Sequence, residues 1–219
     1  MELDLSPVEA RVVGALMEKE RATPQNYPLT LNSTLSACNQ KSNRHPVMAL
    51  EETTVLRALE QLMAKGVVQR LIADDARVPK YRQTFTDKVG LMVPAAAAVV
   101  CVLLLRGPQT PGEIGGRTER LFKFETLDEV TETVLSLLER EPEPYVLQLP
   151  RQPGTKESRY AHLFSGEIDV EVAEVKEAAV LTVVAENERI DHLEAEVRAL
   201  REDIESIKTA FDTFRTQFE

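Results

Sequence analysis

The side chains of this chain whose types suggest binding chemistry are basic and amide groups placed around one predicted helix. Lys41, Asn43 and Arg44 precede that helix, and Arg57 and Gln61 lie on it. Cationic groups release counterions when they meet nucleic-acid phosphates, whereas arginine and glutamine can hydrogen-bond to base edges. The pattern therefore predicts phosphate contacts from the first three residues and base contacts from Arg57 and Gln61. The alternative is that these residues form a solvated face and make hydrogen bonds that brace the loop before the helix.

Further basic residues lie in or beside two turns, each of which joins two predicted extended segments. They are Arg77, Lys80, Arg82, Arg151, Lys156 and Arg159. Two extended segments joined by a turn predict a β-hairpin. Basic side chains on such a hairpin are suited to contacts with the phosphate backbone.

The corresponding helix in the second half of the chain, over 127–140, carries a different charge. Its outward positions include Asp128, Glu129, Glu132 and Glu139. A carboxylate brought to a polyanion is repelled and recovers no counterion release. If DNA is bound, we expect the first half of the chain to make the contacts with its bases.

No constellation for catalysis is evident in the sequence. The three histidines, His45, His162 and His192, fall in a loop, a strand and a helix, without the spacing of a metal site or a triad. The glycine-rich stretch Gly112–Gly116 lacks the lysine and hydroxyl of a phosphate-binding loop. We therefore expect neither an enzyme nor a bound metal or cofactor.

The predicted helices and strands that must position these residues occur in the same order twice along the chain. Pro7 and Pro24 recur as Pro94 and Pro111 at the same offset. Each copy reads as three helices followed by a hairpin, which is the order of the winged helix-turn-helix. The predicted fold class is mainly α with small β-hairpins (α+β), with tandem winged-helix modules over 1–88 and 89–165.

Local signals give boundaries for these helices. In the first copy they indicate a helix capped by Ser6, a second over 29–38, and a third over 51–65 that ends at Gly66. In the second copy they indicate a helix over 91–105, a loop formed by Gly112–Gly116, and a helix capped by Thr126.

The C-terminal part carries a separate pattern. Residues 166–188 form a predicted acidic linker, which with the following segment accounts for most of the net charge of −10. The segment 189–219 has apolar residues alternately three and four apart, typical of a coiled coil: Ile190, Leu193, Val197, Leu200, Ile204, Ile207, Phe211, Phe214 and Phe218. A parallel homodimer is one interpretation; the alternative is that this helix folds back on its own modules.

Composition limits the class of protein. Hydrophobic residues make up 43% of the 219 residues, a share normal for a folded protein. Two cysteines without spacing partners, and an acidic start at Met1-Glu2, favour a cytoplasmic protein without a signal peptide. The longest apolar run, 91–105, contains Pro94 and is shorter than the roughly 18 residues that suggest a membrane span.

Long motifs in the chain resemble those of the bacterial YceH-like proteins. They are Leu5–Val12, Thr23–Leu29, Ala37–Met48, Leu103–Glu113 and Glu157–Glu167, so the resemblance spans 5–167. It implies a cytoplasmic bacterial protein of two winged-helix modules whose biochemical role is not established. One departure is His45, which stands where the Asn-Arg-x-Pro-Val-Met motif of the family leads us to expect an acidic residue.

Two function classes follow from these observations. The first is a DNA-binding regulator or nucleoid-associated factor that acts as a dimer and uses the first module and the hairpins. The second is a protein-interaction scaffold that binds other proteins through its modules without binding DNA. The near-neutral modules and the acidic helix of the second copy favour the scaffold, whereas the fold analogy favours the regulator.

Overall fold

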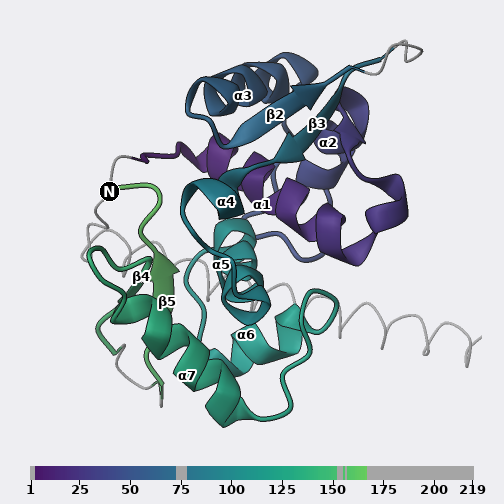
Figure 1. Cartoon of the computed structure of the whole chain (residues 1–219). Helices are drawn as coiled ribbons and strands as arrows, with labels where there is room; N and C mark the ends of the chain where they lie inside the picture. The colour runs from purple at the N-terminus through teal and green to yellow at the C-terminus, as the bar shows by residue number, and fades with distance from the viewer. Residues whose placement is uncertain (1–2, 73–77, 152–154, 156, 167–219) are drawn as a thin grey trace, which may run out of the picture. The chain divides into compact units, whose positions relative to one another are not determined.

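The computed structural model describes residues 3–72, 78–151, 155 and 157–166 (Figure 1). All of them belong to one compact unit, Met1–Ile168. Together they give a mixed α+β architecture of helices and small antiparallel sheets. The predicted linker from residue 167 onward, the predicted coiled coil over 189–219 and the dimer seam on it all lie outside the described residues.

The first half of the unit contains four α-helices and a three-stranded sheet within the described residues. In chain order the elements are α1 (Pro7–Ala22), the 3-10 helix η1 (Pro24–Asn26), β1 (Leu29–Thr30), α2 (Leu31–Cys38), α3 (Glu52–Ala64), β2 (Val68–Leu71), β3 (Lys80–Gln83) and α4 (Phe85–Lys88). The predicted helix over 29–38 thus begins two residues later than expected, because Leu29 and Thr30 pair with β3 instead.

Helix α1 begins after the predicted cap, Ser6, which forms a capping box with Glu9. The Glu9 backbone N–H donates to Ser6 Oγ at 3.3 Å, and the Ser6 N–H donates to Glu9 Oε2 at 2.7 Å. Together these bonds satisfy donors that the first helical turn leaves without intrahelical partners. The predicted end of α3 is also confirmed, since Gly66 follows it with a φ of 71°, a conformation that glycine adopts without strain.

The three-stranded sheet has the order β1-β3-β2 and is antiparallel throughout. Val68 pairs with Gln83, and both are buried, whereas Gln69 pairs with Arg82 and both are exposed. Residues directly opposite each other in a sheet share a face. The β2–β3 hairpin therefore has one face against the core and one face that carries Arg82 into solvent.

The second half repeats this order with fewer strand residues. Its elements are α5 (Pro94–Arg106), α6 (Pro111–Thr118), α7 (Leu127–Leu138), β4 (Val146–Gln148) and β5 (Tyr160–His162). Strands β4 and β5 form an antiparallel pair, and Gln109 adds a single bridge to Tyr160 in the place that β1 occupies in the first half. The two halves thus share the order of three helices followed by a β-hairpin, as the duplicated sequence predicts.

The prediction of a loop at Gly112–Gly116 is wrong, because those residues form most of α6. Thr110 caps this helix and Glu113 completes a capping box with it, while Pro111 occupies the first turn. Ile114 is fully buried. The caps and the burial of Ile114 outweigh the roughly 1 kcal/mol that each glycine costs in a helix.

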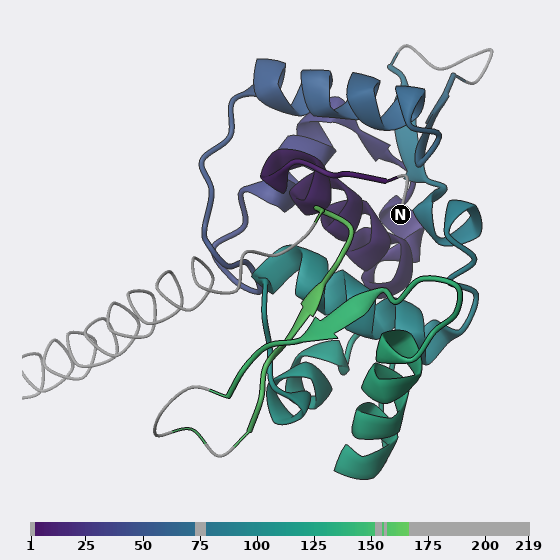
Figure 2. The ribbon, with the colours of Figure 1, turned by 90° about the vertical axis from the view of Figure 1, so that its left-hand side faces the viewer.

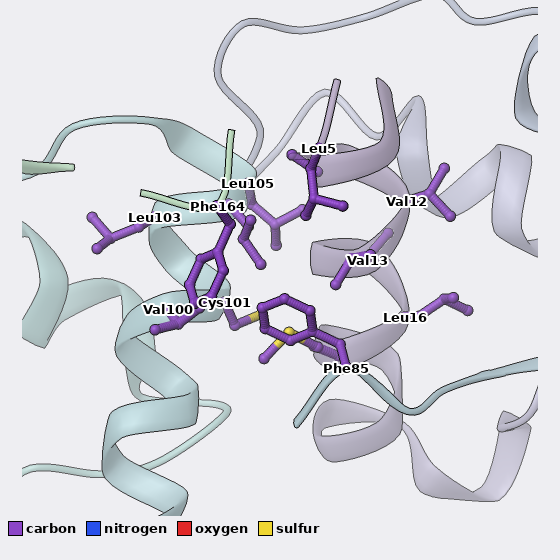
Figure 3. Packing of buried hydrophobic residues seen from close by; sticks show 14 of the residues in the cluster. Leu5, Val12, Val13, Leu16, Phe85, Val100, Cys101, Leu103, Leu105 and Phe164 are labelled. Atoms are coloured by element: carbon purple, nitrogen blue, oxygen red, sulfur yellow. The ribbon is translucent and has the colours of Figure 1, made fainter. Parts of the chain in front are cut away.

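One hydrophobic core runs through both halves. Helices α1 and α5 pack against each other at its centre, and the α5 residues from Ala96 to Leu105 are all buried, which is typical of a helix enclosed on every side. Figure 3 shows Phe85 from the first half beside Phe164 from the second, with ring centroids 4.8 Å apart in an edge-to-face arrangement. The two predicted modules therefore share apolar contacts.

The N-terminal segment joins the same core. Leu5 is buried, and its backbone N–H donates to the Phe164 carbonyl at 2.7 Å. Asp4 forms a bridge with Ser165. The first described residues of the unit are thus tied to its last ones.

In Figures 1 and 2, α3 and the β2–β3 hairpin lie above α1, whereas α7 lies below α5. Figure 1 shows the β4–β5 hairpin beside α5. Over the part of the chain that the structure describes, no helix has the length and apolar character needed to cross a membrane.

Candidate nucleic-acid interface

Helix α3 presents the predicted base-contacting residues to solvent. Val55, Leu59 and Leu62 turn one side of the helix into the core. Arg57 and Gln61 are exposed on the other side, one helical turn apart. Arg57 makes no hydrogen bond or salt bridge with any other described residue, so its guanidinium is free to meet a ligand.

The β2–β3 hairpin, which follows α3 directly, adds three exposed cations. Lys80 and Arg82 are exposed on β3, and Arg70 is exposed on β2. Arg82 Nε donates to Gln69 Oε1 at 2.7 Å across the strand pair, which orients the guanidinium on the exposed face. Arg77, predicted beside these residues, lies outside the described residues.

The three residues predicted as phosphate contacts in the loop between α2 and α3 differ in their exposure to solvent. Lys41 and Asn43 are exposed, as a phosphate contact requires. The neighbouring Arg44 is buried, with a side chain that is 0% exposed. Its prediction as a phosphate contact does not fit the structure, because its donors already have protein acceptors.

Arg44 is the centre of a buried ion pair. Its Nη1 and Nη2 donate to the two Glu18 carboxylate oxygens at 3.0 Å and 2.6 Å, and Nε and Nη2 both donate to the Ala37 carbonyl. Burial by itself raises the pKa of Glu18, but the hydrogen bonds and charge of Arg44 outweigh it, so the pKa is lowered. The pair joins α1, the end of α2 and the following loop.

A second buried arginine, Arg11, is a feature that the sequence interpretation missed. Its guanidinium donates to the carbonyls of Cys38 and Pro46 at 3.1 Å and 2.6 Å, and to that of Leu105 at 3.5 Å. Burial, and then the charge of Arg44, lower its pKa. Its place in α1 among apolar neighbours is the one sequence signal that could have indicated burial, since a lone cation there must find carbonyl partners.

The basic residues predicted around the second hairpin are less accessible. Arg159 donates to Glu113 Oε2 at 2.8 Å and to the Pro108 carbonyl at 3.0 Å. Arg151 is exposed, and its Nε donates to the Thr155 carbonyl at 2.7 Å. Lys156 lies outside the described residues. Of this group only Arg151 presents a cation to solvent in the described residues.

Helix α7 is placed like α3, whose exposed side carries Glu52 and Glu60 beside Arg57, but α7 has no cation to offset its carboxylates. Asp128, Glu129, Glu132 and Glu139 are all exposed, and α7 contains no basic residue. Its buried side, Val130, Val134 and Leu137, corresponds to the buried side of α3. The two halves therefore share a backbone plan and differ in surface charge.

Other reactive groups in the described residues are enclosed. Cys38 and Cys101 are buried free thiols, and burial raises the pKa of Cys38 to about 12, so it is not a thiolate at neutral pH. Burial lowers the pKa of His162 to about 4. Within the described residues no three histidine, cysteine or acidic side chains gather as metal ligands.

The fold defines a class: an α+β protein with two similar helix-and-hairpin halves. The chain matches the family described as "Protein of unknown function, DUF480" over residues 5–155. It is 51% identical over the full length of both chains to a UPF0502 protein of Geobacter sulfurreducens, and 47% identical, again over the full length of both, to one of Solibacter usitatus. A UPF0502 protein of Vibrio vulnificus is 44% identical over 95% of this chain and 97% of its own. The chain belongs to this DUF480/UPF0502 family.

Proposed function

We propose that the protein binds double-stranded DNA through its first half, with α3 in the major groove and the β2–β3 hairpin against the backbone. On this proposal each half is a winged helix-turn-helix, as the resemblance to the YceH-like proteins also implies. The helix order and the pairing β1-β3-β2 support that interpretation.

The observation that carries the proposal is the exposure of Arg57 and Gln61 on α3 beside the exposed Lys80 and Arg82 of the hairpin. An exposed arginine and glutamine can make bidentate hydrogen bonds to guanine and adenine. Lysine and arginine on the hairpin supply phosphate contacts that orient the protein without reading sequence. Arg44 and Arg159 are left out of the proposed contacts because protein groups occupy their donors.

Titration of fluorescently labelled duplex DNA tests the proposal. With the full chain, we expect binding that weakens steeply between about 50 and about 200 mM salt, because each phosphate contact releases counterions. The double variant Lys80→Gln with Arg82→Gln removes two such contacts. It should weaken binding on all sequences alike and reduce the slope of log K against log salt by about 2.

A second variant distinguishes contacts to bases from contacts to phosphates. Arg57→Ala should cost about 1–3 kcal/mol on a preferred sequence and much less on a random one. Lys123→Gln removes one exposed cation from the second half and is the matched control, for which we expect unchanged affinity. Absence of binding at low salt by a chain that is folded would rule out the proposal.

We further propose that the protein acts as a dimer through the heptad positions of 189–219. Light scattering on the full chain should give twice the monomer mass, and Leu193→Glu with Leu200→Glu should give the monomer mass, because a charge at a seam position is buried against the partner. A monomeric full chain would instead favour the interpretation in which the helix folds back.

The acidic face of α7 supports a second candidate, a protein-interaction scaffold. Three exposed carboxylates on α7 and a fourth at its C-cap, Glu139, suit a basic protein partner better than a nucleic acid. If the scaffold interpretation holds alone, duplex DNA does not bind even at low salt. The same titration therefore separates the two candidates.

A further inference from the structure

A polar cleft lies between the two halves, away from the α3 surface. It has a volume of about 280 Å³. Its lining comes from α1, from the loop after α2, from the end of α5 and from α6 with the turn that follows. Asn43, one of the predicted phosphate contacts, lies on its wall.

The charges that line this cleft are predominantly positive. Lys19, Arg106, Arg117 and Arg120 face Glu18 and Glu119. Glu18 is already neutralised by Arg44, which lies behind the wall, and Lys19 is within 3.3 Å of the same carboxylate. The cations of the cleft therefore exceed the carboxylates that remain to balance them.

Arg106, at the C-terminal end of α5, has no acceptor for its guanidinium among the described residues. Its Nε is buried, and among the described residues no group accepts a hydrogen bond from the guanidinium or forms a salt bridge with it. A buried guanidinium donor without an acceptor costs about 1–3 kcal/mol or more. Its Nη1 and Nη2 also have no acceptor among the described residues, but they are not buried, so they can meet a ligand in the cleft that supplies acceptor oxygens.

Arg117 extends the same donor surface from α6. Its Nη1 is buried without a hydrogen bond in the described residues and forms a salt bridge with Glu113 Oε1 at 3.6 Å. Glu113 is engaged elsewhere, since it accepts from the Thr110 N–H at 3.0 Å and from Arg159 at 2.8 Å. The Glu113 carboxylate thus pairs with Arg159 and Arg117. It acts on Arg106 only through its charge, without a direct contact.

The electrostatics around the cleft agree with this surplus of positive charge. Burial, and then the charge of Arg117, lower the pKa of Arg106. Burial, followed by the charges of Arg106, Arg11, Arg117 and Arg159, lowers the pKa of His45. An anion placed among these groups would favour their charged forms and raise the pKa of each.

We propose that this cleft binds a small phosphate-bearing ligand whose phosphate oxygens accept hydrogen bonds from Arg106 and Arg117. Two guanidinium groups suit a dianion, because each can donate two parallel hydrogen bonds to phosphate oxygens. Val102, Leu105 and Leu121 give the cleft an apolar side for the rest of such a molecule. The site is independent of DNA binding by α3.

Calorimetric titration of the full chain with pyrophosphate, at constant ionic strength set with chloride, tests the proposal. We expect saturable binding with one site per chain. Arg106→Gln and Arg117→Gln should each weaken it at least tenfold, and Arg106→Lys, which keeps the charge but loses the paired donors, should weaken it less than Arg106→Gln. Lys88→Gln, which removes an exposed cation of α4, should leave it unchanged.

Two results would overturn the proposal. One is pyrophosphate affinity that is the same for the wild type and for both glutamine variants, each shown by circular dichroism to be folded. The other is a loss of duplex DNA affinity in Arg106→Gln without any pyrophosphate binding by the wild type, which would assign the cleft to the DNA backbone. Because Arg57→Ala does not alter the cleft, its pyrophosphate affinity should equal that of the wild type whether or not DNA binds.

Discussion

Arginine serves two opposite purposes in this protein, and its surroundings decide which. Arg57 is exposed on α3, whereas Arg11 and Arg44 are buried and spend their donors on carbonyls and on Glu18. A guanidinium satisfied by the protein holds segments together, and one in solvent can meet a ligand. The number of basic residues in the first half therefore overstates its capacity for phosphate.

Replacement of Arg44 by leucine should destabilise the fold strongly. The substitution leaves the Glu18 carboxylate in a largely buried site with only Lys19 as a cationic partner. Removal of one member of a buried ion pair typically costs about 3–5 kcal/mol. Urea unfolding of the full chain, followed by circular dichroism, measures this change.

The double variant Arg44→Leu with Glu18→Leu is the control for that experiment. With both charges removed, the loss should be clearly smaller than the sum of the two single losses, because no uncompensated charge remains. A loss below about 1 kcal/mol for Arg44→Leu alone would mean that the pair behaves like an exposed salt bridge.

Sequence could predict which side chains are exposed on α3 and the hairpin, but not which cations are buried. Arg57 and Lys80 follow from helical and strand periodicity, which assigns a face to each residue. The burial of Arg44 depends on Glu18, which lies 26 positions away in the chain. The exposed donors of Arg106 likewise depend on how α5 meets α6, which no local pattern contains.

Among the elements, α1 and α5 share the most extensive contact. Gly14 faces α5 at a point where a Cβ atom would lie 2.9 Å from Leu105 Cγ and 3.1 Å from Leu104 Cβ. Cys101 Sγ also donates to the Gly14 carbonyl at 3.4 Å. The absence of a side chain at Gly14 lets the two helices approach each other.

Gly14→Ala should therefore destabilise the protein although alanine is the better helix former. The gain of up to about 1 kcal/mol from helix propensity competes with an overpacking cost of about 1–3 kcal/mol in a buried contact. Leu104 Cβ is fixed by its backbone, so the contact has little freedom to relax. We expect a net loss, measured as a lower thermal midpoint of the full chain.

Gly116→Ala provides the matched comparison. Gly116 lies in α6, and a Cβ there would meet no atom within 4 Å. Only the propensity gain applies, so the thermal midpoint should rise. If Gly14→Ala also raised it, the close packing of α1 on α5 would be contradicted.

The elements themselves were largely predictable, with one informative exception. Ser6 and Thr126 cap helices as the sequence indicates, because a cap depends on residues only three positions apart. The stretch Gly112–Gly116 was predicted as a loop from its glycines and is helical. Its helix is stabilised by Thr110, Glu113 and the burial of Ile114, so local propensity lost to capping and tertiary packing.

At the scale of the molecule, the shared core makes the two halves one folding unit. Phe85 and Phe164 pack edge to face, and the Cys101 thiol of the second half donates a hydrogen bond to the Gly14 carbonyl of the first. Separation of the halves would expose the buried faces of both α1 and α5. The stability of each half therefore depends on the other.

We expect the described unit to unfold in a single transition. Leu59→Ala in α3 and Leu137→Ala in α7 remove buried side chains from different halves, and each should cost about 2–5 kcal/mol. Both should shift the same calorimetric peak to lower temperature, because neither half keeps its core alone. Two separate peaks, with each variant shifting only one, would show that the halves fold independently.

The pairing of Leu5 with Phe164 has a consequence for synthesis on the ribosome. The backbone N–H of Leu5 finds its carbonyl partner only after residue 164 has left the exit tunnel. At ordinary translation rates that interval is on the order of 10 s. During this interval the apolar face of α1 that α5 covers in the folded protein is exposed on the nascent first half. We therefore expect the nascent chain to depend on chaperones until β5 emerges.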